Sequence, residues 1–399
     1  MFRKTEMKRI YLDHVAATPL LPEVIEAMLP FFRERFGNAQ SLHADGQVVL
    51  DAVEEARTRT GRLINAEPAE VIFTASGSEA NNLAVKGLAS ARRAKGTHLV
   101  LSAVEHQSVI NSAKSLEKMG FTTTLVPVDP AGTVHPGDVE KAMTKDTVLI
   151  SVMLANSEIG TIEPVAEIAR IAQGRNILFH TDAVAAAGSV PIDVKALGVD
   201  ALSLAGDQFY GPKGGAALYL KKGTRILPLI EGGIQEGGRR GGTENVPAIV
   251  GLGVAAEIAR KKLDERAAKA RVLRDELIRG LPAKIDRVIL TGHPQNRLPH
   301  HASFVVEFIE GEAMLLSLDM KGIAVSSGSA CTSKALKASH VILATGIDHA
   351  TAQGSVVFSL LEDTTAEDIA AVLEIFPPIV DRLRKMSPLY TQFLKEGQT

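Results

Sequence analysis

The chain contains one cysteine, Cys331, among 399 residues. A single thiol excludes a disulfide within the chain and a metal site built only from the cysteines of one chain. The chain also lacks an excess of either charge, because the formal net charge is −2 and there is no long basic run. This balance argues against a nucleic-acid-binding surface.

Long apolar segments are missing as well. The longest apolar run covers residues 249–256, far short of the ~20 residues that span a bilayer. The N-terminal segment is charged and lacks the apolar stretch of a signal peptide. We therefore expect a cytoplasmic protein that does not enter a membrane.

Strands and amphipathic helices alternate through the first two thirds of the chain. The hydrophobic fraction of 45% is enough for a large core, expected as two lobes. Near-continuous apolar strands between helices predict a mostly parallel sheet covered on both faces. The expected strands are 10–13, 71–74, 98–101, 121–126, 148–152, 177–180, 201–204 and 216–220, and the helices are 22–36, 47–64, 79–93, 107–119, 139–143 and 165–173.

A long helical stretch, lightly broken, follows Pro247 and ends near residue 280. It becomes strongly charged from Arg260, which predicts a solvated helix face and marks a domain boundary. We expect a large α/β domain over 16–262 and a smaller α/β domain formed by 1–15 and 263–399. The expected elements of the latter are strands at 303–308, 323–325 and 356–360 and helices at 312–320 and from about 366.

The last two expected strands of the large domain, 201–204 and 216–220, form a hairpin. A Gly/Pro-rich loop, residues 205–215, connects them. It is either a sharp turn or a place where a ligand approaches the backbone closely. A second small-residue loop, Thr74–Asn82, follows an apolar strand. Its backbone N–H groups and serines suit a phosphate, but helix capping by Ser76 or Ser78 explains the loop equally well.

Three further polar groups follow predicted strands. His106 is either a packed residue or a planar side chain that stacks on an aromatic ligand. The segment 156–160 comes after the expected strand 148–152, and Asp182 follows the strand 177–180, where an acid could pair with a protonated ring nitrogen. Since ligands of parallel sheets bind beyond the carboxyl ends of the strands, these groups together indicate a pyridoxal phosphate site.

Cys331 lies in the segment Ser326–Ser333, which is rich in serine and glycine. A lone cysteine is more often an inert buried thiol, but these neighbours favour an exposed loop. A nucleophilic or metal-binding thiol is therefore expected here.

These motifs resemble the cysteine desulfurases, pyridoxal phosphate enzymes of the class V aminotransferase superfamily that supply sulfur for iron–sulfur clusters. The resemblance extends from Tyr11–Pro19 to 387–390, and its most specific parts are Ser326–Ser333 and Gly211–Gly214. It implies a homodimer of the fold-type I, aspartate-aminotransferase-like α/β architecture, with a large mostly parallel sheet domain and a smaller C-terminal domain.

The resemblance also implies roles for individual residues. Cys331 would attack the sulfur of L-cysteine bound to the cofactor and would pass a persulfide to a scaffold or other acceptor protein. His106 would stack on the ring and take part in catalysis. The remaining cofactor contacts would be Gly77 and Ser78 at the phosphate, Asp182 at the ring nitrogen, Asn156, Gln208 at the aldimine position, and Thr243 at the neighbouring subunit's phosphate.

The chain departs from this family where the cofactor is attached. The family has His-Lys before the Gly-Pro-Lys-Gly turn, and here these positions are Asp207 and Gln208. Glutamine cannot form a Schiff base or shuttle the required proton. Lys213 coexists with the aldimine lysine in the family and is expected to be structural. Further losses are Ala205 for a phosphate-binding Ser, Ala185 for a Gln, Ser157 for an Asn, and Val357 for the Arg that binds the substrate carboxylate.

Two main hypotheses follow. The first is a cysteine-desulfurase-like protein of iron–sulfur assembly or sulfur transfer with its own desulfurase chemistry lost or impaired, in which Cys331 is a persulfide carrier or an iron–sulfur cluster ligand shared with a partner. The alternative is an active cysteine desulfurase that binds pyridoxal phosphate non-covalently. A structural or regulatory subunit, in which neither the pocket nor Cys331 matters, is a third class.

Overall fold

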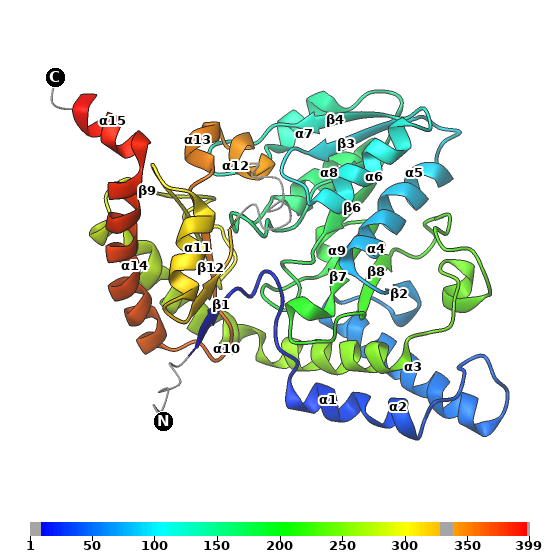
Figure 1. The fold of residues 1–399 in the computed structure, drawn as a ribbon. Coiled ribbons are helices and arrows are strands. Elements are labelled where there is room, and N and C mark those ends of the chain that lie inside the picture. Colours follow the sequence, from blue (N-terminus) through cyan, green and yellow to red (C-terminus); the bar gives the residue numbers. More distant parts are fainter. Residues whose placement is uncertain (1–8, 328–337, 397–399) are drawn as a thin grey trace.

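The computed structural model describes residues 9–327 and 338–396. Its larger part is an α/β unit around a seven-stranded sheet with the order β2-β8-β7-β6-β5-β3-β4 (Figure 1). The strands are β2 (Val71–Thr74), β3 (His98–Ser102), β4 (Thr122–Val126), β5 (Thr147–Ser151), β6 (Leu178–Asp182), β7 (Ala201–Ala205) and β8 (Ala216–Leu220).

Helices cover both faces of this sheet (Figure 1). The α-helices are α1 (Pro22–Met28), α2 (Pro30–Arg33), α3 (Ala44–Leu63), α4 (Gly77–Asn82), α5 (Leu88–Ala91), α6 (Gln107–Glu117), α7 (Pro136–Ala142), α8 (Val165–Gly174) and α9 (Val194–Leu197). Shorter turns are η1 (Pro68–Glu70), the π-helical η2 (Leu83–Gly87), η3 (Gly206–Gln208) and η4 (Gln235–Gly238).

The pairing of the strands confirms the predicted mostly parallel sheet. β4, β3, β5, β6 and β7 are parallel neighbours, whereas β8 runs antiparallel to both β7 and β2. The β7–β8 pair is the predicted hairpin. Because the parallel strands end at the same edge, the loops that follow β3, β5, β6 and β7 gather there.

Alternating side chains divide the strands between two cores. Phe73, Val100 and Phe179 pack on the face covered by α3 and α8, while Ile72 and Leu99 pack against α4, α5 and α6 on the other face. Successive residues of a strand point to opposite faces, so a strand buried on both faces needs an unbroken apolar run. This is the pattern that the sequence contains.

The smaller part holds a three-stranded antiparallel sheet, β12-β10-β9, and the parallel pair β1-β11 (Figure 1). Its elements are β1 (Ile10–Leu12), β9 (Val288–Leu290), β10 (His301–Val306), α11 (Gly311–Asp319), β11 (Ile323–Val325), α12 (His340–Ala344), α13 (His349–Ala352), β12 (Ser355–Ser359), α14 (Ala366–Met386) and α15 (Pro388–Glu396). The N-terminal strand thus packs with C-terminal elements.

The helix α10 (Val246–Lys284) joins the two parts without a break. Its residues up to Ala259 belong to the core of the large sheet, and those from Leu273 belong to the core of the smaller part. The change of core between these residues supports the boundary after residue 262, which we keep as a proposal.

Several elements differ from the sequence-based expectation. The helix expected over 22–36 is two helices, because Pro30 has no N–H to donate and begins a new turn. The helix expected from Glu79 begins at Gly77, and β9 and α15 had no predicted counterpart. Within the described residues, no helix is both long and apolar enough to cross a membrane.

Candidate active site

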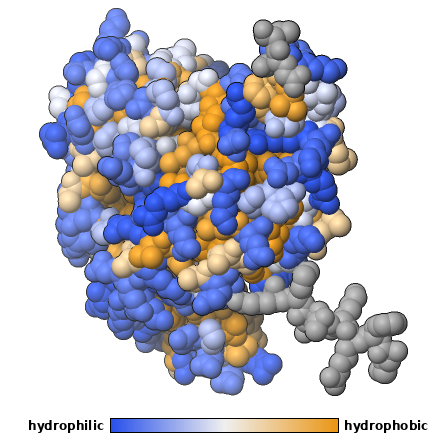
Figure 2. All heavy atoms as spheres, turned by 90° about the vertical axis from the view of Figure 1, so that its left-hand side faces the viewer, coloured by the Kyte–Doolittle hydropathy of each residue, from blue (hydrophilic) through white to orange (hydrophobic). Residues whose placement is uncertain are grey.

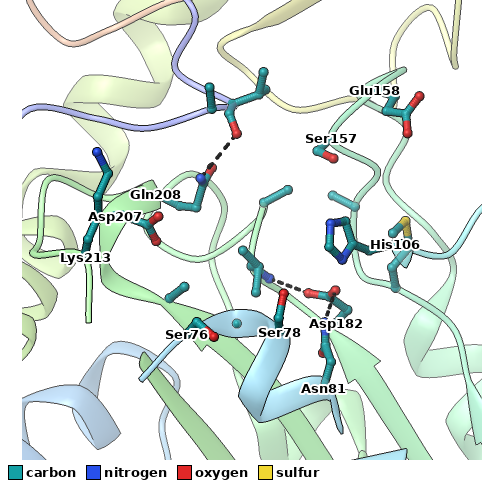
Figure 3. A pocket seen from close by; sticks show the side chains of 18 of the residues that line it. Ser76, Ser78, Asn81, His106, Ser157, Glu158, Asp182, Asp207, Gln208 and Lys213 are labelled. Atoms are coloured by element: carbon teal, nitrogen blue, oxygen red, sulfur yellow. Dashed lines mark hydrogen bonds between the residues drawn. The ribbon is translucent and has the colours of Figure 1, made fainter. Parts of the chain in front are cut away.

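A cavity of about 650 Å³ opens where the carboxyl ends of the parallel strands meet (Figure 3). Its wall is formed by β-strand ends, the first turn of α4 and segments of the smaller part. The lining residues are Val15, Ala16, Ala75, Ser76, Gly77, Ser78, Asn81, His106, Met153, Ala155, Ser157, Glu158, Asp182, Val184, Ala185, Ala205, Asp207, Gln208, Lys213, Gly214, Gly215, Ser326, Ser327 and Val357.

The loop after β2 brings the start of α4 to the cavity. Ser76 is the N-cap of this helix, and its hydroxyl accepts a hydrogen bond from the Glu79 N–H at 3.1 Å. The capping explanation of this loop is therefore confirmed for Ser76. Gly77 and Ser78 line the cavity, and a Cβ on Gly77 would lie 2.6 Å from a methyl group of Val184. Glycine is required there for the close approach.

Asp182 lies at the floor of the cavity, at the end of β6, and is almost fully buried (Figure 3). One carboxylate oxygen accepts from the Val184 N–H at 2.9 Å, and the other accepts from the Asn81 amide at 2.6 Å. Burial raises the pKa of Asp182, although the charge of His106 and both hydrogen bonds act in the opposite direction. An anionic Asp182 therefore calls for a cationic partner in the cavity.

His106 is the N-cap of α6 and faces the cavity from the side opposite Gln208 (Figure 3). Its Nδ1 accepts from the Ser108 N–H at 3.2 Å and lies 2.7 Å from the Ser108 hydroxyl. The same hydroxyl accepts from Asn81 at 2.9 Å. Hydrogen bonds thus connect Asp182 to His106 through two intervening side chains, and the tautomer with a proton on Nε2 fits them.

A second carboxyl group is buried behind this wall. Glu105 accepts from the Met153 N–H through one oxygen at 2.6 Å, and its other oxygen has no partner within the described part of the chain. Burial, with Asp182 nearby, raises the pKa of Glu105 well above its usual range. Its surroundings therefore favour the neutral form of the Glu105 carboxyl group over the charged form.

Asn156, one of the expected cofactor contacts, does not line the cavity. Its amide donates to the Val104 carbonyl at 2.9 Å, and its oxygen accepts from the N–H groups of Glu158 and Ile159 at 2.8 and 3.0 Å. It therefore holds the turn after β5 in shape. The neighbouring Ser157 is the residue that reaches the cavity.

Asp207 and Gln208 line one side of the cavity together with Lys213 (Figure 3). The Gln208 amide donates to the Val15 carbonyl at 3.3 Å. Burial raises the pKa of Asp207, and the charge of Lys213 partly offsets this shift. A carboxylate and an amide therefore occupy the wall where the resemblance places a histidine and a lysine.

The other positions of lost family residues line the same cavity, namely Ser157, Ala185, Ala205 and Val357. Val357 exchanges two backbone hydrogen bonds with Ser326, at 2.8 and 3.1 Å, which fixes this strand segment at the wall. Three of these four positions carry methyl or isopropyl groups. They make this wall more apolar than the resemblance predicts.

Glu158, which sequence reasoning did not identify, lines the cavity opposite Gln208 (Figure 3). Its carboxylate accepts a short hydrogen bond from the Ser339 hydroxyl. Burial raises the pKa of Glu158 to about 7, although this hydrogen bond acts in the opposite direction. Asn81 was also missed, and its place one turn after Ser78 on α4 is the signal that could have identified it.

Two predicted residues lie elsewhere. Thr243 is exposed and does not line the cavity of its own chain. Cys331 lies outside the described residues, as does the metal site predicted there. Within residues 9–327 and 338–396, no group of three or more His, Cys, Asp or Glu side chains is placed to hold a metal ion.

Comparison with known proteins places this site in a family. Residues 10–372 match the model of the class V aminotransferases. The chain is 48% identical over 383 residues to cysteine desulfurase IscS of Dictyoglomus turgidum, which covers 96% of this chain and 97% of that protein. It is 49% identical over 385 residues to IscS of Methanosarcina thermophila, with 96% and 95% covered.

A solved structure supports the same assignment. A NifS-like protein superposes with a TM-score of 0.88 at 35% sequence identity, covering 94% of this chain and 100% of the other. The cavity therefore sits in a fold that the two share from end to end. This chain belongs to the class V aminotransferase family and, within it, to the cysteine desulfurases.

Proposed function

We propose that this protein serves iron–sulfur cluster assembly or sulfur transfer with its own desulfurase reaction lost or severely impaired. The observation that supports this proposal is Gln208, an amide in the cavity wall at the position of the aldimine lysine. An amide nitrogen is not nucleophilic and cannot attach a carbonyl cofactor. In this function Cys331 accepts sulfur rather than generating it.

The family uses pyridoxal phosphate, which supplies an electron sink for reactions at the α-carbon of amino acids. The ring fits the residues present, since Asp182 lies at the floor and His106 at the wall. The phosphate end does not fit, because Ala205 presents a methyl group where the family resemblance implies a hydroxyl donor, and the Asp207 carboxylate lines the same cavity. We therefore assign no chemical step to this cofactor.

The proposed role of Cys331 is sulfur transfer or cluster ligation. In transfer, the Cys331 thiolate attacks the outer sulfur of a donor persulfide, the donor leaves as a thiolate, and Cys331 becomes the persulfide. A scaffold or acceptor protein then takes that sulfur. As a ligand, the same thiolate would bind iron of a cluster held jointly with the scaffold.

Exposed apolar residues support the proposed homodimer. Phe36, Leu42 and Ile234 are 81%, 93% and 78% exposed. Gln40 and Ile234 line one surface hollow, so these two segments lie together. Leaving such a patch in water is unfavourable, and a second copy would cover it. In that dimer Thr243 would face the neighbouring cavity, as the family resemblance implies.

A second apolar region suits a scaffold partner. Figure 2 shows the face of the smaller part, where hydrophobic residues gather among hydrophilic ones. On the C-terminal helices, Met386, Leu389 and Leu394 are 74%, 55% and 47% exposed. Because the family uses its C-terminal tail and cysteine loop to face the scaffold, we place the sulfur acceptor on this side.

The test combines a sulfide-release assay with a cluster-formation assay. We expect the purified protein, with added pyridoxal phosphate and cysteine, to release no sulfide, yet to accelerate cluster formation on a scaffold when a persulfide donor is supplied. Cys331→Ala should abolish the acceleration. Sulfide release proportional to added pyridoxal phosphate and lost in Asp182→Ala would support the active enzyme instead. Normal acceleration by Cys331→Ala would refute the proposal.

A further inference from the structure

The cavity has an unusual balance of charged groups. Three carboxyl groups line it, from Glu158, Asp182 and Asp207, and among the described lining residues only His106 and Lys213 can be cationic. A site for a ligand with a phosphate and a carboxylate needs an excess of cations and hydrogen-bond donors. This cavity offers the opposite balance.

The carboxylate that would repel a phosphate, that of Asp207, lies on one side of the cavity. Figure 3 shows the Asp207 carboxylate in the cavity, between Lys213 and the start of α4 at Ser76. Beside it, Ala205 presents a methyl group rather than a hydroxyl. A phosphate placed against α4 would thus have a carboxylate for a neighbour and would lose one donor, and like charges in a partly enclosed site disfavour binding.

The remaining wall suits an aromatic ring without acidic groups. Val15, Val184 and Val357 supply apolar surface, and His106 presents a flat side chain. Asp182 at the floor can pair with a protonated ring nitrogen. Two hydrogen bonds, one to each oxygen, already hold its carboxylate in a fixed orientation. A cavity of about 650 Å³ that combines apolar wall surface with an oriented polar group at its floor is typical of a small-molecule site.

We propose that the cavity binds a nitrogen heteroaromatic that is neutral or singly cationic and has neither phosphate nor carboxylate. Asp182 selects the ring nitrogen, and Asp207 rejects the phosphorylated form. The inference rests on the proposed loss of the desulfurase reaction, because a working enzyme needs the phosphorylated cofactor in this place.

The test compares pyridoxine with pyridoxine 5′-phosphate by titration calorimetry of the full-length protein. Neither probe has an aldehyde, so Schiff bases with surface lysines cannot contribute. We expect pyridoxine to bind about tenfold or more tightly than its phosphate. Asp207→Asn should reduce that ratio, Ala205→Ser with Asp207→His should reverse it, and the exposed Asp264→Asn should leave it unchanged.

Three outcomes would overturn the inference: equal or tighter binding of the phosphate, no binding of either probe, or a preference that Asp207→Asn does not alter. Asp182→Asn should weaken pyridoxine binding, and circular dichroism of each variant checks that it folds. The sulfide assay is independent of these titrations. Sulfide release with pyridoxal phosphate would refute the proposed function, whereas a failed titration without sulfide would refute only the ligand class.

Discussion

The Asn81 amide nitrogen lies 2.6 Å from a carboxylate oxygen of Asp182, and this pair is buried at the floor of the cavity. The same amide also reaches the Ser108 hydroxyl, which contacts His106. Asn81 therefore orients both residues that the family resemblance assigns to a ligand ring. It is therefore a positioning residue for this pair, and it also lines the cavity.

We predict that Asn81→Ala lowers the free energy of unfolding by about 1–3 kcal/mol at pH 7, because a buried carboxylate loses its donor. The loss should be smaller at pH 4, since a protonated Asp182 needs that donor less. Urea unfolding at both pH values measures it. Asn82→Ala, the next residue, is the matched control and should change stability little, because its half-buried side chain donates only to the Ser78 carbonyl, in an exposed contact. Equal losses at the two pH values would contradict the explanation.

Glu163 should make stability fall as the pH rises. Burial raises its pKa to about 8, with one oxygen accepting from the Val134 N–H at 2.8 Å. Below the unfolded pKa both states are protonated, and the full contribution is present. Between that value and about pH 8 the unfolded state alone loses its proton, so stability decreases by up to about 1.4 kcal/mol per pH unit.

Urea unfolding of Glu163→Gln between pH 5 and 8 tests this. The variant should show a shallower decline than the parent, because glutamine does not titrate, and its oxygen can still accept from Val134. Glu117→Gln, at an exposed position of α6, should keep the parent slope. A Glu163→Gln slope identical to the parent's would show that Glu163 ionises normally in the folded protein.

Gln208→Lys should allow covalent attachment of pyridoxal phosphate. With Asp207→His added, attachment should increase, because the carboxylate that repels the phosphate is gone. Borohydride reduction followed by peptide mass measurement locates the label. We expect it at residue 208 in the variants, with Gln392→Lys on α15 as the control for any new lysine. A parent protein labelled at Lys213 to the same extent would contradict this prediction.

Leu42→Glu should weaken the proposed homodimer. The side chain is 93% exposed in the single chain, so the charge disturbs an interface without disturbing a core. Light scattering at several concentrations should show a shift toward the mass of one chain. Met119→Glu, at another exposed apolar position, should leave the mass unchanged. A parent protein that is already monomeric would contradict the proposed dimer.

The sequence could predict features that depend on one strand or one loop. The apolar runs of the sheet are continuous because both faces are buried, and the strand-end rule brought His106, Asp182 and Gln208 to one cavity. The role of Asn81 could not be predicted, because its partner lies 101 residues away in the chain. The cofactor contact of Asn156 stays a prediction, because an Asn after a strand holds a turn as readily as it contacts a ligand.

The continuity of the helix α10 across both parts has a consequence for how the protein unfolds. It is 39 residues long, about 58 Å, and its two halves belong to different hydrophobic cores. If either core unfolded, one half of the helix would lose its packing contacts. An isolated half-helix is only marginally stable in water. The two cores should therefore melt as one cooperative unit, so that a ligand bound in the cavity of the large sheet also protects the C-terminal helices from exchange with solvent.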